Sequence, residues 1–78
     1  MTKREKLIER IRARPSQARF ADVQAVLEDF GWRLRNETGS HAIFIKAGED
    51  HLSIPKVGGR HVKGPYLDLI CIRLGLDE

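Results

Sequence analysis

The chain has 78 residues, of which 41% are hydrophobic and 32% charged, and this composition predicts one ordinary globular domain. No apolar run approaches the ~20 residues of a membrane span, and the basic N-terminus lacks the apolar core of a signal peptide. We therefore expect a cytoplasmic protein that does not use a membrane. The net charge of +3 permits a nucleic-acid partner without requiring one.

The N-terminal segment predicts a basic helix at about residues 2–14. Thr2 and Glu5 fit a capping box that starts it, and Pro15 stops it. Its apolar stripe is narrow, so we expect an amphipathic helix that docks on the domain. A helix that steers phosphate groups is the alternative. Residues 15–17 then form a short linker.

A second helix is predicted from Phe20 to Phe30. Its apolar residues recur at helical spacing, so this stripe belongs to the core. Gly31 fits the left-handed residue that follows many helices.

Three strands are expected next, over residues 32–36, 40–46 and 50–54. Glu37-Thr38-Gly39 fits a three-residue hairpin loop with Gly39 in the left-handed conformation. This loop pairs residue 36 with residue 40. The second turn pairs Phe44 with Leu52.

This register divides the strand residues between two faces. The face expected to pack under the helices is apolar and consists of Trp32, Leu34, Ala42, Phe44, Leu52 and Ile54. The opposite face is polar and positive and consists of Arg33, Arg35, His41, Ile43, Ile45, His51 and Ser53.

On the positive face the predicted register sets Arg35 directly opposite His41, with Cβ atoms about 5 Å apart. A cation beside an imidazole favours its neutral form, which is the form that a general base needs. Arg35 would also hold a phosphate against the imidazole. Metal-free RNA cleavage requires such a base for the ribose 2′-OH and cations for the phosphoryl oxygens. A surface histidine without a function is the alternative for His41.

The remaining histidines fit no catalytic or metal site. His51 lies about 13 Å from His41 along the same face, too far for direct cooperation. His61 belongs to a glycine-rich basic loop that also contains Gly58, Gly59 and Lys63. Three widely spaced histidines without a Cys-x-x-Cys pair argue against zinc, and we expect no cofactor.

The last helix is predicted from Gly64-Pro65 to Leu74, with Gly75 as its cap. Its apolar arc is unusually wide, which fits either a fully buried helix or a helix with a partner surface. The single cysteine, Cys71, lies in this arc and predicts a buried thiol. The predicted order is α-α-β-β-β-α, an α+β fold with helices on one face of a three-stranded antiparallel sheet.

Residues 18 to 76 resemble the HicA toxins, small mRNA interferases of type II toxin–antitoxin modules. The first half of the match is a helix that ends in Phe30-Gly31-Trp32 and a following Gly39-Ser40-His41-Ala42-Ile43-Phe44. The second half contains Leu52-Ser53-Ile54-Pro55, Val57-Gly58-Gly59, Val62-Lys63-Gly64 and Tyr66. The helix before Pro15 is an addition to the minimal pattern. On this resemblance the chain is one HicA-like domain over residues 1–78.

The resemblance implies a fold like that of double-stranded-RNA-binding domains and a ribonuclease that cleaves mRNA without a metal. It implies that His41 is the catalytic residue, and that a HicB-type antitoxin covers the active face. A second acid remains unassigned, because Ala42 follows His41 where some members carry another histidine. For phosphate contacts we nominate Arg33, Arg35 and Lys56 from geometry.

Two other functions are compatible with the sequence. The first is a non-catalytic RNA-binding module of the same fold, which would hold RNA through its arginines and lysines. The second is a protein-interaction domain that uses the apolar final helix.

Overall fold

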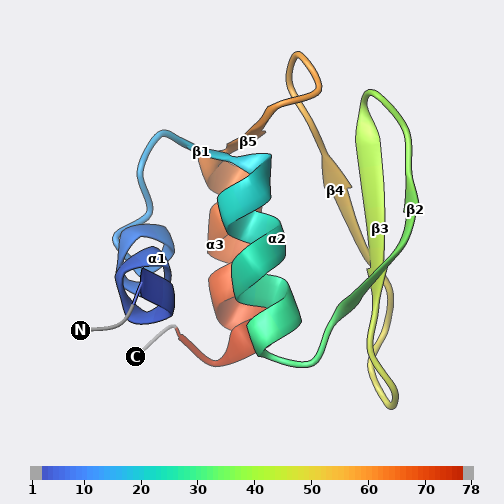
Figure 1. Ribbon diagram of the computed structural model, residues 1–78, viewed down its shortest axis with the longest axis horizontal. Helices are drawn as coiled ribbons and strands as arrows, with labels where there is room; N and C mark the ends of the chain where they lie inside the picture. Colours follow the sequence, from blue (N-terminus) through green and yellow to red (C-terminus); the bar gives the residue numbers. More distant parts are fainter. Residues whose placement is uncertain (1–2, 77–78) are drawn as a thin grey trace.

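The computed structural model describes residues 3–76 and has an α+β fold, as expected (Figure 1). Its elements in chain order are α1 (Lys3–Arg12), β1 (Gln17–Arg19), α2 (Phe20–Asp29), β2 (Arg33–Glu37), β3 (His41–Ile45), β4 (Leu52–Pro55), β5 (His61–Lys63) and α3 (Gly64–Leu74). Strands β2, β3 and β4 form an antiparallel sheet in that order. Helices α2 and α3 lie on one side of this sheet, and α1 lies beyond them (Figure 1).

The helix boundaries follow the signals expected from the sequence. Gly31 adopts a positive φ of 92° directly after α2, and Gly75 caps α3 with a φ of 73°. Pro65 lies in the first turn of α3, where its missing N–H costs no hydrogen bond. The predicted capping residue Thr2 lies outside the described residues.

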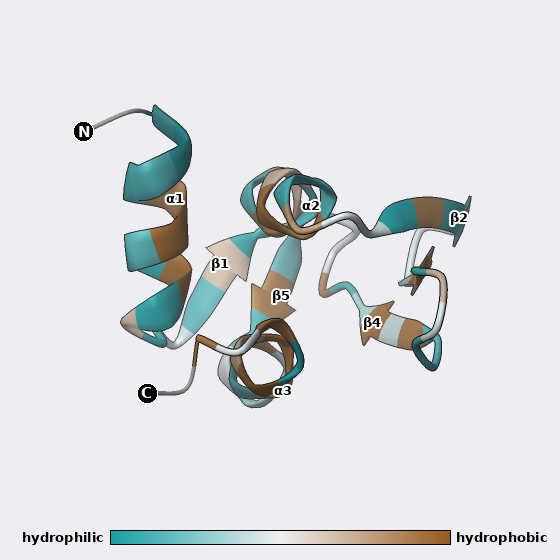
Figure 2. Ribbon diagram, turned by 90° about the horizontal axis from the view of Figure 1, so that it is seen from below, coloured by the Kyte–Doolittle hydropathy of each residue, from teal (hydrophilic) through white to brown (hydrophobic). Residues whose placement is uncertain are grey.

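Two short strands, β1 and β5, were not predicted. They pair antiparallel, with Ala18 opposite Val62; β1 begins at the last residue of the expected linker, and β5 lies in the expected flexible loop. Each strand has three residues, too few to show an alternation of apolar and polar side chains. Their pairing joins the start of α2 to the start of α3, between the two helices in Figure 2.

The predicted register of the first hairpin is wrong by two residues or more. Leu34 pairs with Phe44 instead of Ala42, and Glu37 pairs with Ala42. A β-bulge between Leu34 and Asn36 takes up the odd residue. The second hairpin has the predicted register, with Phe44 opposite Leu52.

The predicted assignment of strand side chains to the two faces of the sheet is nevertheless correct. Before the bulge the shift is two residues, and such a shift keeps each side chain on its face, because side chains alternate along a strand. The predicted core residues of the strands are buried, except Leu34, which is half-buried. The opposite side of the sheet, here called the outer face, carries exposed or half-buried residues: Arg33, Arg35, His41, Ile43, Ile45 and Ser53.

The hairpin loop is also shorter than predicted. The Thr38 N–H donates to the His41 carbonyl at 2.8 Å, so Gly39 and Ser40 form the tip. Gly39 does not have a positive φ, unlike five other glycines of the described chain. A two-residue tip therefore replaces the expected three-residue loop with its left-handed glycine.

The core extends to α1, whose apolar side faces the rest of the protein (Figure 2). Ile11 is fully buried, and its carbonyl accepts a hydrogen bond from the Cys71 thiol at 3.6 Å. The buried thiol of Cys71 was predicted. Helix α3 is not fully buried, since Tyr66, Leu69 and Ile72 are exposed. Within residues 3–76, no helix is long and apolar enough to cross a membrane.

One close backbone contact brings the loop of residues 57–60 against the tip of the β2–β3 turn. Gly59 has a φ of 71°, and a Cβ atom on it would lie 3.2 Å from the Gly39 carbonyl oxygen. Gly58, with a φ of 62°, has open space around the same position. Gly59 therefore serves both the backbone conformation and the close approach.

We expect Ile11→Ala to lower the free energy of unfolding by about 2–4 kcal/mol, because it leaves a cavity in the shared core. The matched control is Ile72→Ala, the same change at an exposed position of α3, which should cost about 0.5 kcal/mol or less. Urea denaturation of both variants measures the difference. Equal costs would mean that α1 does not belong to the core.

Gly59→Ala should destabilise the protein more than Gly58→Ala. Both variants strain a left-handed residue by about 1–2 kcal/mol, but only Gly59→Ala also forces a methyl group against the Gly39 carbonyl. Thermal unfolding of the pair isolates this contact, because the backbone cost is common to both. Equal unfolding midpoints would show that the loop can move away from the turn freely.

Candidate active site

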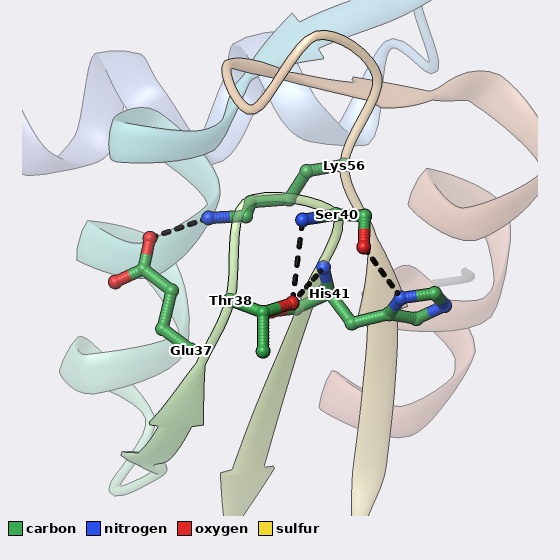
Figure 3. Close-up of polar contacts among 5 residues, drawn as sticks. All are labelled: Glu37, Thr38, Ser40, His41 and Lys56. Carbon is green, nitrogen blue, oxygen red and sulfur yellow. Dashed lines mark hydrogen bonds and ion pairs between the residues drawn. The ribbon is translucent and has the colours of Figure 1, made fainter.

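The β2–β3 turn positions His41 through the side chain of Thr38. The Thr38 hydroxyl oxygen accepts hydrogen bonds from the backbone N–H groups of Ser40 at 3.3 Å and His41 at 3.0 Å (Figure 3). Threonine often organises a turn in this way, since its short side chain reaches backbone donors two or three residues on. Because the turn satisfies its own donors, His41 starts β3 with a defined backbone position.

The imidazole of His41 is exposed and oriented by its neighbour. Its Nδ1 lies 3.3 Å from the Ser40 Oγ (Figure 3). In the tautomer protonated on Nδ1, this nitrogen donates to Ser40, and Nε2 keeps its lone pair for another partner. Such a nitrogen can accept a proton from a ligand.

Lys56 occupies the other side of the same turn. Its backbone N–H donates to the Ser40 carbonyl at 2.7 Å, which joins the end of β4 to the turn. Its side chain is 3% exposed, forms an ion pair with Glu37 at 2.5 Å, and lies 4.7 Å from the centre of the Phe20 ring. In this structure the ammonium group is enclosed, although Lys56 was nominated for a phosphate contact.

Arg35 does not lie beside His41. It sits at the β-bulge, next to Asn36, and Asn36 pairs with Ile43 rather than with His41. The expected pairing of Arg35 with His41 is therefore wrong. Along β3, Ile43 is two residues from His41, about 7 Å. Arg33 pairs with Ile45, which is farther along the same face.

Both arginines are nevertheless available on the outer face. Among residues 3–76, no ion pair or side-chain hydrogen bond engages Arg33 or Arg35, and both are exposed. The outer face thus presents His41 at one end and two guanidinium groups towards the other.

Within residues 3–76, the arginines in and just after α1, unlike Arg33 and Arg35, form ion pairs with acidic side chains. Arg4 pairs with Asp29 at 3.1 Å, and Arg10 contacts Asp22 at 3.5 Å, so these arginines dock α1 on α2. Arg14, two residues after the end of α1, makes a further ion pair, with Asp68 of α3 at 2.7 Å. This favours the docked amphipathic helix over the phosphate-steering helix, because these three cations already have acidic partners.

The other two histidines lie apart from this site. His51 is exposed just before β4, near the turn at the opposite end of the sheet. His61 is half-buried at the start of β5, opposite Arg19.

Two features of the site were missed in the sequence. Thr38 has a recognisable signal, since a threonine before Gly-Ser suits a side-chain-stabilised turn. The Glu37–Lys56 pair has none, because the two residues are 19 positions apart and meet only after both strands pair.

The comparisons with known proteins bear on the identity of the chain. No curated protein and no solved structure matches it. A family model described as HicA toxin of bacterial toxin–antitoxin matches residues 20–76, which is well over half of the chain and includes the turn, His41 and Lys56. The chain therefore belongs to the HicA toxin family.

Proposed function

We propose that this protein is a ribonuclease toxin that cleaves mRNA, with His41 as its catalytic residue and no metal in the reaction. The observation that carries the proposal is the exposed imidazole whose Nδ1 is held by Ser40, at the end of a face with two available arginines. Membership of a toxin family supports the same function.

In the proposed reaction Nε2 of His41 removes the proton from a ribose 2′-OH. The 2′ oxygen then attacks the adjacent phosphorus, and the bond from phosphorus to the 5′ oxygen breaks. The products are a 2′,3′-cyclic phosphate and a 5′-hydroxyl end, and water supplies the proton of the leaving oxygen. The nucleophile belongs to the substrate, so the protein needs a base and charge stabilisation rather than a metal-bound water.

Arg33 and Arg35 are proposed to bind the RNA phosphates, since their guanidinium groups are exposed on the same face as His41. Lys56 remains a third candidate, but its ammonium group would have to leave Glu37 before it could contact a phosphate. Its backbone bond to Ser40 also gives it a second role, in holding His41 in place.

A toxin of a toxin–antitoxin system has an antitoxin as its partner. We propose that this antitoxin is of the HicB type and that it inhibits the toxin by covering the outer face. An antitoxin in this position would block access to His41 and to both arginines at once.

His41→Ala should lower the rate of RNA cleavage by about 100- to 10,000-fold and abolish growth arrest on induction, while circular dichroism shows an intact fold. The control is His51→Ala, an exposed histidine at the other end of the sheet, which should cleave like the unaltered protein. A folded His41→Ala protein that is equally toxic would overturn the assignment. RNA that the unaltered protein binds but leaves intact would instead indicate a non-catalytic RNA-binding module.

Arg35→Gln should weaken RNA binding and reduce its dependence on salt. One lost phosphate contact lowers the slope of log affinity against log salt concentration by about 1. Binding of a labelled RNA to His41→Ala protein, with and without the Arg35 change, measures this slope. Arg12→Gln on α1 removes the same charge at a position paired with Glu9 and should leave the slope unchanged. An unchanged slope for Arg35→Gln would remove this residue from the RNA site.

A further inference from the structure

A cavity of about 440 Å³ opens where the start of α2 meets the start of β5. It is lined by Arg19, Phe20, Ala21, Gly59, Arg60 and His61. Its volume falls in the range of pockets that bind small molecules, about 300–1,000 Å³. The reaction proposed above does not use any of these residues.

The rim of the cavity is positive. Arg60 is exposed, and no ion pair or side-chain hydrogen bond to it occurs within residues 3–76. Arg19 is also exposed, and its Nε lies 3.7 Å from a carboxylate oxygen of Asp22. The N-terminal end of α2 adds a partial positive charge, although the Phe20 N–H itself donates to the Arg60 carbonyl at 2.7 Å. An anionic group is the ligand that this rim favours.

The wall of the cavity is largely apolar. Phe20 and Ala21 contribute carbon atoms, and Gly59 has no side chain. Phe20 is 7% exposed and fixed from behind, because its ring contacts the ammonium group of Lys56 and packs 6.0 Å from the Phe44 ring. A rigid apolar wall below a cationic rim suits a ligand that has a flat apolar part and a negative part.

The cavity adjoins the turn that carries His41. Gly59 lines the cavity and lies against the Gly39 carbonyl oxygen, two residues before His41. Lys56, just before the same loop, is bonded to Ser40. Figure 1 shows the β2–β3 turn, this loop and the start of α2 at one end of the molecule. A strand of RNA at His41 would therefore reach the cavity with a neighbouring nucleotide.

We propose that the cavity binds one unpaired nucleotide of the RNA substrate, next to the nucleotide that is cleaved. The base lies against the wall formed by Phe20 and Ala21, and its phosphate contacts Arg60. Recognition of single-stranded RNA commonly combines these two interactions, an unstacked base on an apolar side chain and a phosphate on a cation. This inference rests on the proposed ribonuclease function and adds a substrate subsite to it.

The test compares cleavage of a short single-stranded RNA by the full-length protein and two variants. Ala21→Leu fills the cavity without changing charge, and Arg60→Gln removes a cation from its rim. Each should raise KM by about tenfold and leave kcat within about twofold, since Ala21→Leu displaces the base from its apolar wall and Arg60→Gln removes the cation that binds the phosphate. Ala47→Leu adds the same atoms to an exposed residue of the β3–β4 turn, and it should leave both constants unchanged.

A second arm uses RNAs that lack one base at a time. With the unaltered protein, one missing base next to the cleaved nucleotide should raise KM by about tenfold. With Ala21→Leu the same missing base should have no further effect, because the subsite is already filled. Thermal unfolding shows which variants are folded. If Ala21→Leu does not fold, Arg60→Gln still tests the proposal.

The outcomes separate this inference from the function on which it rests. Cleavage by all variants with the KM of the unaltered protein would overturn the subsite and leave the ribonuclease function intact. If the unaltered protein neither binds nor cleaves RNA, both proposals are wrong. If the variants cleave normally but need about ten times more antitoxin for inhibition, the cavity binds the partner protein and the nucleotide assignment is wrong.

Discussion

The contacts of Lys56 hold together the part of the molecule on which the candidate site depends. Its backbone N–H binds the Ser40 carbonyl, its ammonium group binds Glu37, and the same group lies over the Phe20 ring. One residue thus links the end of β4, the end of β2 and the start of α2. A buried cation without its partner carboxylate is costly, so the ammonium group of Lys56 constrains the position of Glu37. Both the turn that carries His41 and the wall of the neighbouring cavity depend on these contacts.

The distribution of charge matters more here than the net charge of +3. Arg4 of α1 binds an acidic side chain of α2, and Arg14, just after α1, binds one of α3, which leaves them little capacity to attract RNA. The arginines without partners in the described chain lie elsewhere: Arg33 and Arg35 on the outer face and Arg60 at the cavity. His41 lies at the turn where the outer face and the cavity loop meet. A single RNA strand that follows these cations would pass the imidazole.

Much of the fold was predictable because its signals are local or strongly periodic. The apolar stripe of α2 and the left-handed glycine after it need no tertiary information. The strand faces were predicted correctly despite a wrong register, because a shift of two residues preserves the alternation of side chains. The bulge at Arg35 was not predictable, because it arises from the pairing of β2 with β3 and has no signal in the local sequence. The pair β1–β5 was missed for the same reason, because each strand exists only through its partner.

By itself, the sequence determined the fold class, the apolar core face and the exposure of His41 on the opposite face. These properties follow from the spacing of apolar residues along each helix or strand, and this spacing does not depend on which element packs against it. Only the tertiary structure decided which groups are neighbours of His41. In the structure Arg35 does not lie beside the imidazole, Ser40 contacts the imidazole, and Lys56 is enclosed and pairs with Glu37. The tertiary structure also formed the cavity from Phe20 and Arg60, which are 40 residues apart. Neighbours of this kind depend on strand register and loop closure, and neither follows from the local pattern of residues.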